Sequence, residues 1–279
     1  MGILYLVATP IGNLDDMTHR AVKTLQIVDL IAAEDTRHTG KLLQHFQIPT
    51  PQISYHDHNR LSRIPELVDK LKAGKNIALV SDAGTPGISD PGQELVAACI
   101  DHGVTVVSIP GATALISALI SSGLKTDRFV FEGFLPTKGK ERHDRLALIQ
   151  SERRTLILYE APHRLRVTLT DLYRTLGGDR RLAAARELTK YHEECWYGTL
   201  DQALVYFADH EPKGEFCLVL AGLPPTDQPV LAPATLRSEL KALLDQGMSR
   251  SQASRQLAEI TQLPRRQLYQ LSLEIELDP

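Results

Sequence analysis

Short apolar runs alternate with segments of helical spacing through the first 121 residues of the chain. Runs at residues 3–8, 30–33, 77–80 and 104–109 predict strands, and residues 18–26, 61–73 and 93–102 carry apolar positions at helical spacing. A further helix is predicted from the PGATA motif at residue 110 to residue 121. Strands and helices that alternate in this way predict a mostly parallel sheet covered by helices on both faces.

The pattern changes after residue 122, where the predicted strands follow one another more closely. Runs at residues 129–133, 155–159, 181–187, 194–199 and 216–221 predict strands, and residues 138–152, 165–176 and 200–210 predict helices. This arrangement indicates a second α/β domain with a mixed sheet. The segment PPTDQPVLAP is typical of a linker, and short helices at 235–246, 249–260 and 265–273 resemble a helix-turn-helix unit.

These patterns together predict three parts. We expect an N-terminal α/β domain at residues 1–122, a C-terminal α/β domain at residues 123–224, and a linker with a small helical extension at residues 225–279. A sheet-and-helix body of this size can bury a sizeable core, since 43% of the 279 residues are hydrophobic and 23% are charged.

The charge and the cysteines narrow the class of protein further. The net charge of −3 argues against a molecule that attracts nucleic acid over its whole surface, so any RNA contact must be local. Three cysteines without a CxxC pair favour a reducing, cytoplasmic setting. The histidines lack metal-ligand spacing, so we expect no metal, and no apolar run is long enough for a membrane span.

The stretch SDAGTPGISDPG, residues 81–92, joins a predicted strand to a predicted helix, which is where α/β proteins hold ligands. It contains no lysine, and the carboxylate of Asp82 would repel a phosphate. Gly84 and Gly87 permit close backbone approach, so the loop favours a cationic, phosphate-free nucleoside. The alternative is a tight turn with no ligand. Two similar loops, ATPIGN and PGATA, end other strands and would share one crevice with it if the sheet is parallel.

Eight motifs then follow one another in a familiar order: VATPIGNLDDMTHRA, AEDTRHTGKLL, SDAGTPGISDPG, SIPGATA, FEGFLP, YEAPHR, RELTKYHEE and KGEF. The chain resembles, over nearly its whole length, the tetrapyrrole methylase superfamily (class III methyltransferases), in the branch that methylates ribosomal RNA. The resemblance implies two α/β domains, S-adenosylmethionine in the cleft between them, and a homodimer. It also implies methylation of a cytidine ribose 2′-hydroxyl in the decoding region of small-subunit rRNA, free or in the assembled small ribosomal subunit.

The resemblance further implies which residues contact the cofactor. This sequence has Ser-Asp-Ala where relatives often have Gly-Asp-Pro, so only the aspartate of that loop is directly comparable, and threonine replaces serine in the PGxS element. Two apolar positions are expected to wall the adenine, Leu188 and Phe216. The other implied positions are Pro10, Gly12, Asp82, Ala83, Gly84, Thr85, Gly111, Ala112, Thr113, Tyr159, Glu160 and Ala161.

Methyl transfer to a hydroxyl depends on placement and benefits from a general base. The catalytic candidates are Glu34, Asp35, Arg37 and Lys190, with Glu187 and His192 as further possible bases, and the choice among them stays open. Arg37 would hold an RNA phosphate or pair with a carboxylate. The alternative for the EDTR motif is a helix N-cap with an acidic first turn. Asp90, at the far end of its loop, is assigned to the start of the following helix.

Basic residues in three places are candidates for RNA contacts. The segment KGKERHDR offers Lys138, Lys140 and Arg142, and the EAPHR motif offers His163 and Arg164. The C-terminal helices offer Arg250, Arg255, Arg265 and Arg266. The alternative in each place is a solvated helix face or a local salt bridge. Two other functions remain open, a tetrapyrrole or corrin methylase and a non-catalytic rRNA-binding assembly factor.

Overall fold

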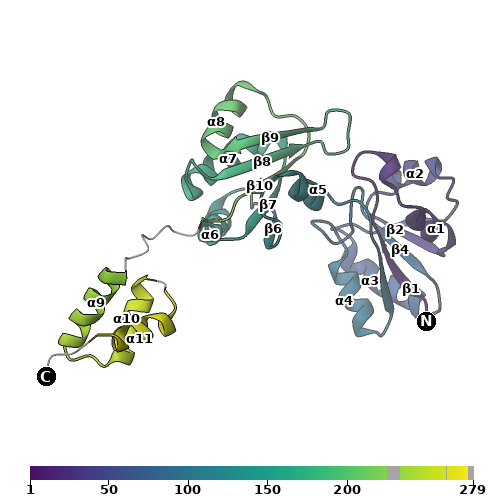
Figure 1. The fold of residues 1–279 in the computed structure, drawn as a ribbon. Helices are drawn as coiled ribbons and strands as arrows, with labels where there is room; N and C mark the ends of the chain where they lie inside the picture. The colour runs from purple at the N-terminus through teal and green to yellow at the C-terminus, as the bar shows by residue number, and fades with distance from the viewer. Residues whose placement is uncertain (225–232, 262, 276–279) are drawn as a thin grey trace. The chain divides into compact units, whose positions relative to one another are not determined.

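The computed structural model describes residues 1–224, 233–261 and 263–275 (Figure 1). The chain forms two compact units, residues 1–224 and residues 225–279. The first unit contains two five-stranded sheets, and the described part of the second contains helices. No helix in the described ranges is long and apolar enough to cross a membrane.

The first sheet is wholly parallel, with the strand order β3-β2-β4-β1-β5. Its central strand β4 is buried on both faces, because Ile77 and Leu79 join one core cluster and Ala78 and Val80 join the other. The strands are β1 (Ile3–Val7), β2 (Leu30–Ala33), β3 (Gln52–Ser54), β4 (Ile77–Val80) and β5 (Thr105–Ile109). The helices that cover it are α1 (His19–Ile27), α2 (Thr36–His45), α3 (Arg60–Lys72) and α4 (Gln93–Asp101).

Two elements of this sheet domain were not predicted from the hydrophobic pattern. The strand β3 is a three-residue edge strand whose side chains are all half-buried, so it carries no apolar run. The helix α2 buries only Thr39 and Leu43, so its apolar stripe is too narrow to stand out. Its start matches the N-cap considered as the alternative for the EDTR motif, because Asp35 is the N-cap and accepts a hydrogen bond from Arg37 N. The expected acidic first turn is wrong, since the first turn of α2 carries no acidic residue.

The second sheet is mixed, as predicted, with the order β6-β7-β10-β8-β9 and a single parallel pair, β6 with β7. Helices α6 (Gly139–Gln150), α7 (Pro162–Leu176) and α8 (Leu200–Asp209) share a core with one face. The strands are β6 (Phe129–Phe134), β7 (Thr155–Glu160), β8 (Arg181–Arg186), β9 (Glu194–Thr199) and β10 (Phe216–Leu220).

Helix α5 (Ala114–Ser121) covers the other face of the second sheet. Its side chains Leu115 and Leu119 pack with Ile157 and Val219, although the helix directly follows the last strand of the first sheet. We therefore propose that the two α/β domains divide before α5, near residue 112, rather than after residue 122. The two domains nevertheless belong to one compact unit.

The C-terminal unit is built from α9 (Pro233–Asp245), α10 (Arg250–Thr261) and α11 (Arg265–Leu273), which confirms the three predicted helices. Leu240, Leu257 and Leu268 form the centre of its small apolar core. A unit with its own core is expected to fold without the sheets. Most of the predicted linker lies outside the described residues.

Candidate ligand-binding site

The three glycine- and proline-rich loops meet at the carboxyl edge of the first sheet, as predicted. Thr9 N donates to the Gly84 carbonyl at 2.8 Å, and Gly84 N donates back to the Thr9 carbonyl at 3.1 Å. Thr85 Oγ1 donates to the Ala112 carbonyl at 3.1 Å and so ties in the third loop. Gly84 has a φ of +83°, a conformation that strains any residue with a Cβ. The loops converge because β4, β1 and β5 are parallel neighbours.

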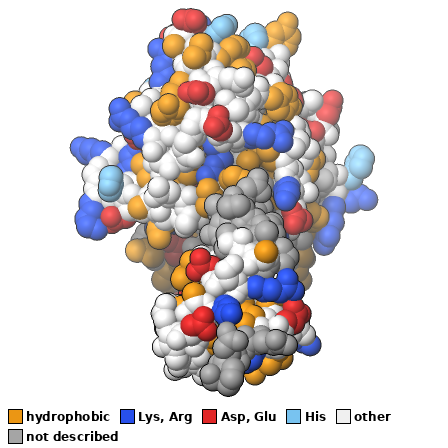
Figure 2. Space-filling model, turned by 60° about the vertical axis from the view of Figure 1, so that its left-hand side comes forward, with side chains coloured by type: hydrophobic (Ala, Val, Ile, Leu, Met, Phe, Trp, Pro, Cys, Tyr) orange, Lys and Arg blue, Asp and Glu red, His pale blue; other side chains and the backbone are white. Residues whose placement is uncertain are grey.

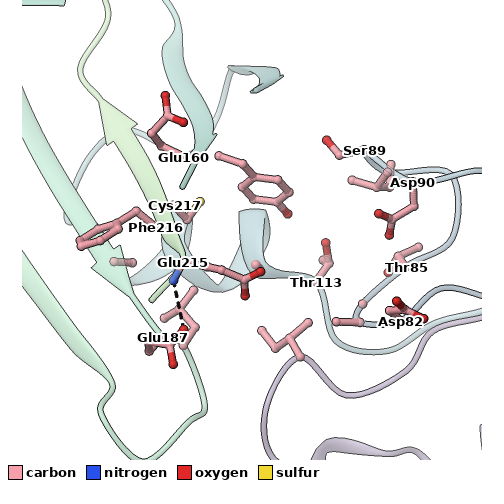
Figure 3. Close-up of a pocket in the computed structure, with 18 of the residues that line it drawn as sticks. Asp82, Thr85, Ser89, Asp90, Thr113, Glu160, Glu187, Glu215, Phe216 and Cys217 are labelled. Carbon is pink, nitrogen blue, oxygen red and sulfur yellow. Dashed lines mark hydrogen bonds between the residues drawn. The ribbon is translucent and has the colours of Figure 1, made fainter. Parts of the chain in front are cut away.

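A cavity of about 250 Å³ opens beside these loops and draws its walls from both sheets (Figure 3). Ile11, Thr113 and Ala114 come from the first and third loops and the start of α5. The second sheet and the loop after β8 contribute Phe134, Tyr159, Glu160, Ala185, Glu187, Leu188, Lys190, Glu215, Phe216 and Cys217. The SDAGTPGISDPG loop and Glu34 supply the remaining wall: Glu34, Asp82, Ala83, Gly84, Thr85, Ile88, Ser89 and Asp90.

Three carboxylates make one end of this cavity acidic. Asp82 Oδ1 accepts a hydrogen bond from Asp35 N at 3.0 Å, and Asp82 N donates to Glu34 Oε2 at 3.3 Å. Burial, helped by the neighbouring charge of Asp82, raises the pKa of Glu34. Burial and the charges of Glu34, Asp82 and Asp57, opposed in part by the Ser81 hydroxyl, raise the pKa of Asp90 to about 7. This end favours a cation.

Asp90 is the lining residue that the sequence analysis assigned elsewhere. We expected it to start the next helix, but α4 begins three residues later, with Gly92 as its N-cap. Ser89 has a φ of +60°, and the turn directs the Asp90 carboxylate into the cavity (Figure 3). The sequence does contain a signal that Asp90 lies outside the helix. Pro91 follows it, and a proline disfavours helical geometry in the residue before it.

Lys190 lines the cavity and is held by two acids, Glu187 and Glu215. These two acids lie across the cavity from Asp82 and Asp90 (Figure 3). Lys190 Nζ lies 2.9 Å from Glu187 Oε1 and 3.0 Å from Glu215 Oε2. Burial alone would lower the pKa of Lys190, but the hydrogen bonds to both glutamates outweigh it and raise that pKa. Lys190 therefore stays protonated, which corrects its candidacy as a general base.

The segment that carries Lys190 adopts an unusual backbone. Glu187 and Thr189 have φ values of +49° and +66°, which are uncommon for residues with a Cβ. Thr189 Oγ1 accepts from Asn13 N at 3.1 Å, so the segment is fastened to the first loop. A Cβ added at Gly12 would lie 2.4 Å from Lys190 Cγ. Glycine is therefore required where the first loop meets the second domain.

Asp35 and Arg37 belong to the start of α2 rather than to the cavity. Arg37 Nη2 lies 2.7 Å from Asp35 Oδ2, and the Arg37 side chain is 88% exposed. The ion pair and the Arg37 backbone N–H lower the pKa of Asp35, so this carboxylate is a poor base. Asp35 is therefore an N-cap rather than our proposed base, and Arg37 pairs with a carboxylate, which is one of the two roles expected for it. Of that motif Glu34 alone lines the cavity.

Two predicted cofactor contacts present only their backbone to the cavity. Phe216 turns its ring away from the cavity (Figure 3). The ring lies in the core shared with α7 and α8, where its centroid is 5.8 Å from that of Phe207. The Glu160 carboxylate accepts from Thr168 Oγ1 at 2.5 Å and pairs with Arg164 at 3.3 Å. Side chains alternate between the faces of a strand, so Cys217 and Tyr159, one position away on each strand, face the cavity instead.

The other predicted contacts differ in how close they lie to the cavity. Leu188 and Tyr159 line it, and Tyr159 Oη accepts from Leu115 N at 3.1 Å. Pro10 and Gly12 line an adjoining cavity that shares Asp82 and Lys190 with the first. The remaining predicted contacts are not among its lining residues: Gly111, Ala112 and Ala161.

Two of the predicted RNA contacts, one buried and one half-buried, are bound to groups of the second domain. Arg142 is 7% exposed and binds Asp171, Thr168 and the Pro136 carbonyl. Arg164 binds the Leu135 carbonyl in addition to Glu160. The buried Arg142 guanidinium compensates buried oxygen atoms and is not available to a phosphate, so we withdraw it as an RNA contact. The Arg164 side chain is half-buried, and its contact with RNA stays a prediction.

The remaining candidates for RNA contacts keep exposed positions. Lys138, Lys140 and His163 are exposed, and Lys140 forms an ion pair with Asp144 at 2.5 Å. In the C-terminal unit, Arg266 is exposed and Arg255 lies 3.2 Å from Glu259.

Arg250 and Arg265 have partners within the C-terminal unit. Arg250 donates to the Ile275 carbonyl at 3.0 Å, and Arg265 donates to Ser251 Oγ at 2.7 Å. Figure 2 shows basic side chains dispersed among acidic ones on the face in view, which fits local rather than global electrostatic contacts. No cluster of three or more His, Cys, Asp or Glu side chains among the described residues could hold a metal ion.

Two family models match the chain. The model of the tetrapyrrole (corrin/porphyrin) methylases matches residues 3–204, and the model of the RsmI C-terminal HTH domain matches residues 231–276. The first match covers the two sheets as far as α8, and the second coincides with the helical unit. The sheet-bearing part and the helical unit therefore each match a family model of their own.

Curated relatives match the chain from end to end. The ribosomal RNA small subunit methyltransferase I of Synechocystis sp. is 71% identical over 278 residues, with 100% of both chains covered. The protein of the same name from Halalkalibacterium halodurans is 47% identical, with 97% of this chain and 94% of the relative covered. That from Bacillus subtilis is 45% identical, with 96% and 93% covered.

Solved structures share the fold of the first unit. The uroporphyrin III C-methyl transferase of Thermus thermophilus, complexed with S-adenyl homocysteine, matches with a TM-score of 0.56 and 20% identity over 79% of this chain and 97% of that chain. A diphthine synthase matches with a TM-score of 0.62 and 14% identity over 79% and 90%. At these identities the two structures establish only the common fold, which confirms the predicted α/β architecture.

Proposed function

This chain belongs to the tetrapyrrole methylase family, and we propose that it is an S-adenosylmethionine-dependent methyltransferase of a ribosomal RNA cytidine 2′-hydroxyl. The relatives named above are ribosomal RNA small subunit methyltransferases, and they match this chain over nearly its whole length. This observation carries the proposal. The helical unit supports RNA as the acceptor, because it matches the model of an RsmI C-terminal domain, whereas the uroporphyrin methyltransferase structure covers 79% of this chain.

The chemistry of the cavity fits this cofactor. S-adenosylmethionine combines an adenosine with a sulfonium and an ammonium group, and it carries no phosphate. The carboxylates of Glu34, Asp82 and Asp90 suit the cations, and Leu188 and Tyr159 suit the apolar faces of a base. Lys190 is the only lysine or arginine that lines the cavity in the described first unit, and its two glutamates neutralise it.

The proposed cofactor contacts follow from this fit. Backbone groups of Gly84 and Thr85 are accessible where the loops meet, and Asp82 lies beside them. The side chains that face the cavity from the second domain are Tyr159, Leu188 and Cys217. We assign Pro10 and Gly12 to the neighbouring wall, where they support the same loop.

Methyl transfer forms an oxygen–carbon bond as the carbon–sulfur bond breaks, and the acceptor hydroxyl must lose its proton. The cofactor supplies the reactive methyl group, so the protein needs to orient the hydroxyl and take this proton. We assign the proton to Asp90, whose pKa near 7 suits a base at neutral pH and whose carboxylate points into the cavity. Among the neighbouring charges, that of Glu34 raises the pKa of Asp90 the most, and Glu34 is the alternative base.

The acceptor can be tested directly with labelled cofactor. We expect label to enter purified small ribosomal subunits or their naked rRNA, and not a tetrapyrrole supplied in parallel. Digestion to nucleosides should place the methyl group on a cytidine ribose. Label on the tetrapyrrole alone would overturn the RNA assignment, and label on a base atom would overturn the ribose assignment.

Cofactor binding separates an enzyme from a non-catalytic assembly factor. Calorimetry should detect S-adenosylmethionine binding, and Asp82→Ala should weaken it while leaving the thermal unfolding transition in place. No heat of binding by the wild-type protein at any concentration would reject the enzyme. We further propose a cytoplasmic homodimer, as the family resemblance implies, and light scattering of the purified chain tests the dimer.

A further inference from the structure

A β-bulge re-aims one aromatic ring of β6. Phe131 pairs with Ile157 and Phe134 pairs with Tyr159, so four residues on β6 oppose three on β7, and the register shifts between Phe131 and Gly133. Regular alternation would place Phe131 and Phe134 on opposite faces. The extra residue, with Gly133 at a φ of +63°, puts both rings on the face that carries the cavity.

The bulge therefore delivers Phe134 to the rim of the cavity. Phe134 lines the cavity and contacts Tyr159 edge-on, with ring centroids 5.7 Å apart, yet its side chain remains 51% exposed. The inner wall differs, since Leu188 is only 9% exposed. An aromatic ring half-open to solvent forgoes apolar burial that the fold could have obtained by regular pairing.

The ring also stands next to the acidic end of the cavity. A Cβ added at Gly133 would lie 3.2 Å from Ser89 Oγ, so the end of β6 touches the loop that carries Asp90. A group that rests on Phe134 would therefore lie near the carboxylate to which we assign the acceptor proton. Ile88, in the same loop, is 38% exposed and adds apolar surface at this rim.

Size decides what can rest there. A cavity of about 250 Å³ cannot admit a polynucleotide, so an RNA chain stays outside and presents a single nucleoside at the mouth. Unpaired bases are commonly held by aromatic stacking, and a ring reachable from solvent is positioned for this. The bound cofactor would instead meet the enclosed walls.

We propose that Phe134 is the stacking platform for the acceptor nucleobase, an unpaired base of the RNA substrate. This inference rests on the proposed function and extends it to a residue that positions the acceptor. Stacking tolerates any base, because every base has a π-face, so Phe134 contributes affinity and placement rather than the choice of cytidine.

Substitutions at Phe134 test the proposal against a matched position on the same strand. Phe134→Ala should raise the KM for RNA about 5- to 100-fold, in line with the usual strength of base stacking. Phe134→Trp should restore it, and Phe134→Leu should not. Phe129→Ala is the control, since Phe129 is 37% exposed near the start of β6 and does not line the cavity; its KM should match wild type.

A second measurement does not depend on turnover. Phe134→Trp places a tryptophan at the rim in a chain whose natural tryptophan is Trp196 alone, so Trp196→Phe in the same variant leaves one fluorophore. Single-stranded RNA that contains cytidine should quench this fluorescence in the presence of S-adenosylhomocysteine. Calorimetry should give the same cofactor Kd for wild type and Phe134→Ala.

The outcomes separate this inference from the proposed function. If wild type transfers no methyl group to RNA, the proposed function fails and the inference falls with it. If wild type transfers the group but Phe134→Ala leaves the KM unchanged, only the inference fails. A cofactor Kd weakened as strongly as the KM, or full rescue by Phe134→Leu, would also overturn it, because Phe134 would then wall the cofactor or serve as apolar packing.

Discussion

At the residue scale, the proposed base Asp90 was not among the candidates chosen from the sequence motifs. Its carboxyl shares one end of the cavity with Glu34 and Asp82, and three acids so close cannot all ionise without cost. Burial and the neighbouring charges raise the pKa of Glu34 and raise the pKa of Asp90 to about 7. An acid poised at neutral pH inside a cavity is typical of a functional site.

Asp90→Asn should lower methyl transfer by about 100-fold or more, the usual contribution of a general base. In the wild-type protein the rate should rise as the pH passes about 7, because only the ionised carboxylate accepts a proton. The variant should lose this rising limb. Asp69→Asn is the control, since Asp69 is exposed on α3, does not line the cavity and is not among the charges that act on Asp90. An unchanged pH profile in Asp90→Asn would transfer the role to Glu34.

The same substitution should change how stability depends on pH. The folded protein holds the Asp90 proton between about pH 4 and 7, whereas the unfolded chain has released it, so the free energy of unfolding falls as the pH rises through this window. The free energy of unfolding of Asp90→Asn should therefore exceed that of wild type by on the order of 1 kcal/mol at pH 8 and by little at pH 4. The gain is small because Asp90 is partly solvated. Denaturant unfolding at both pH values measures the difference.

Arg142 illustrates a basic residue that the structure removes from the surface. Its guanidinium pairs with the Asp171 carboxylate and donates to Thr168 Oγ1. The Thr168 hydroxyl in turn donates to the carboxylate of the buried Glu160. Arg142→Ala should lower the free energy of unfolding by roughly 3 kcal/mol, since it leaves these groups unpaired. Lys138→Ala, at an exposed site nearby, should stay within about 0.5 kcal/mol. A stable Arg142→Ala protein with weakened RNA binding would restore the original assignment.

At the scale of elements, the cavity depends on close approach between the first loop and the segment after β8. Gly12 makes that approach possible, and the segment keeps its shape through two positive φ angles and the bond from Asn13 N to Thr189 Oγ1. Strained backbone near a cavity is typical of functional sites, where surrounding contacts hold it in place.

Gly12→Ala should disturb this junction. The added Cβ would overlap Lys190 Cγ and approach the Leu188 carbonyl to 3.1 Å, so stability should fall by about 1–3 kcal/mol and cofactor affinity should fall with it. Gly40→Ala is the control: it lies inside α2, where its Cβ would meet only the Gln52 amide at 3.2 Å. Alanine there should be neutral or stabilising by up to about 1 kcal/mol. Calorimetry measures the cofactor affinity of both variants, and thermal unfolding measures their stability. Equal cofactor affinity in the two variants would show that the close approach at Gly12 does not shape the cavity.

At the scale of the whole molecule, the two compact units allow binding of the cofactor to be separated from binding of the RNA. Every residue that lines the cavity lies in residues 1–224. The helical unit has its own core and carries the exposed Arg255, Arg265 and Arg266. These properties fit a body that binds cofactor and an appended unit that contributes RNA contacts.

A chain that ends at Pro224 should keep the cofactor Kd of the full protein, because its cavity is intact. It should bind small-subunit rRNA at least about tenfold more weakly, with a shallower dependence of binding on salt concentration, because phosphate contacts by arginine are lost. Filter binding at several salt concentrations provides the measurement. Equal affinity and an equal salt slope in the two chains would remove the helical unit from RNA recognition.

The sequence by itself determined the order of strands and helices, the parallel first sheet and the converging loops, because each depends on local spacing or on short motifs. The acid in the SDAGTPGISDPG loop and the absent lysine likewise identified the kind of ligand before any contact was known. The narrow apolar stripe of α2 and the half-buried β3 left no such signal.

Only the tertiary structure decided which way individual side chains point. Strand parity turned Phe216 and Glu160 away from the cavity, and a single bulge turned Phe134 toward it. Ion pairs hold Arg37 and Lys190 against acids, while burial among carboxylates raises the pKa of Asp90, the residue to which we assign the proton. The physical reason is that a motif specifies residue types at a spacing, whereas orientation, burial and charge depend on neighbours that lie far apart along the chain.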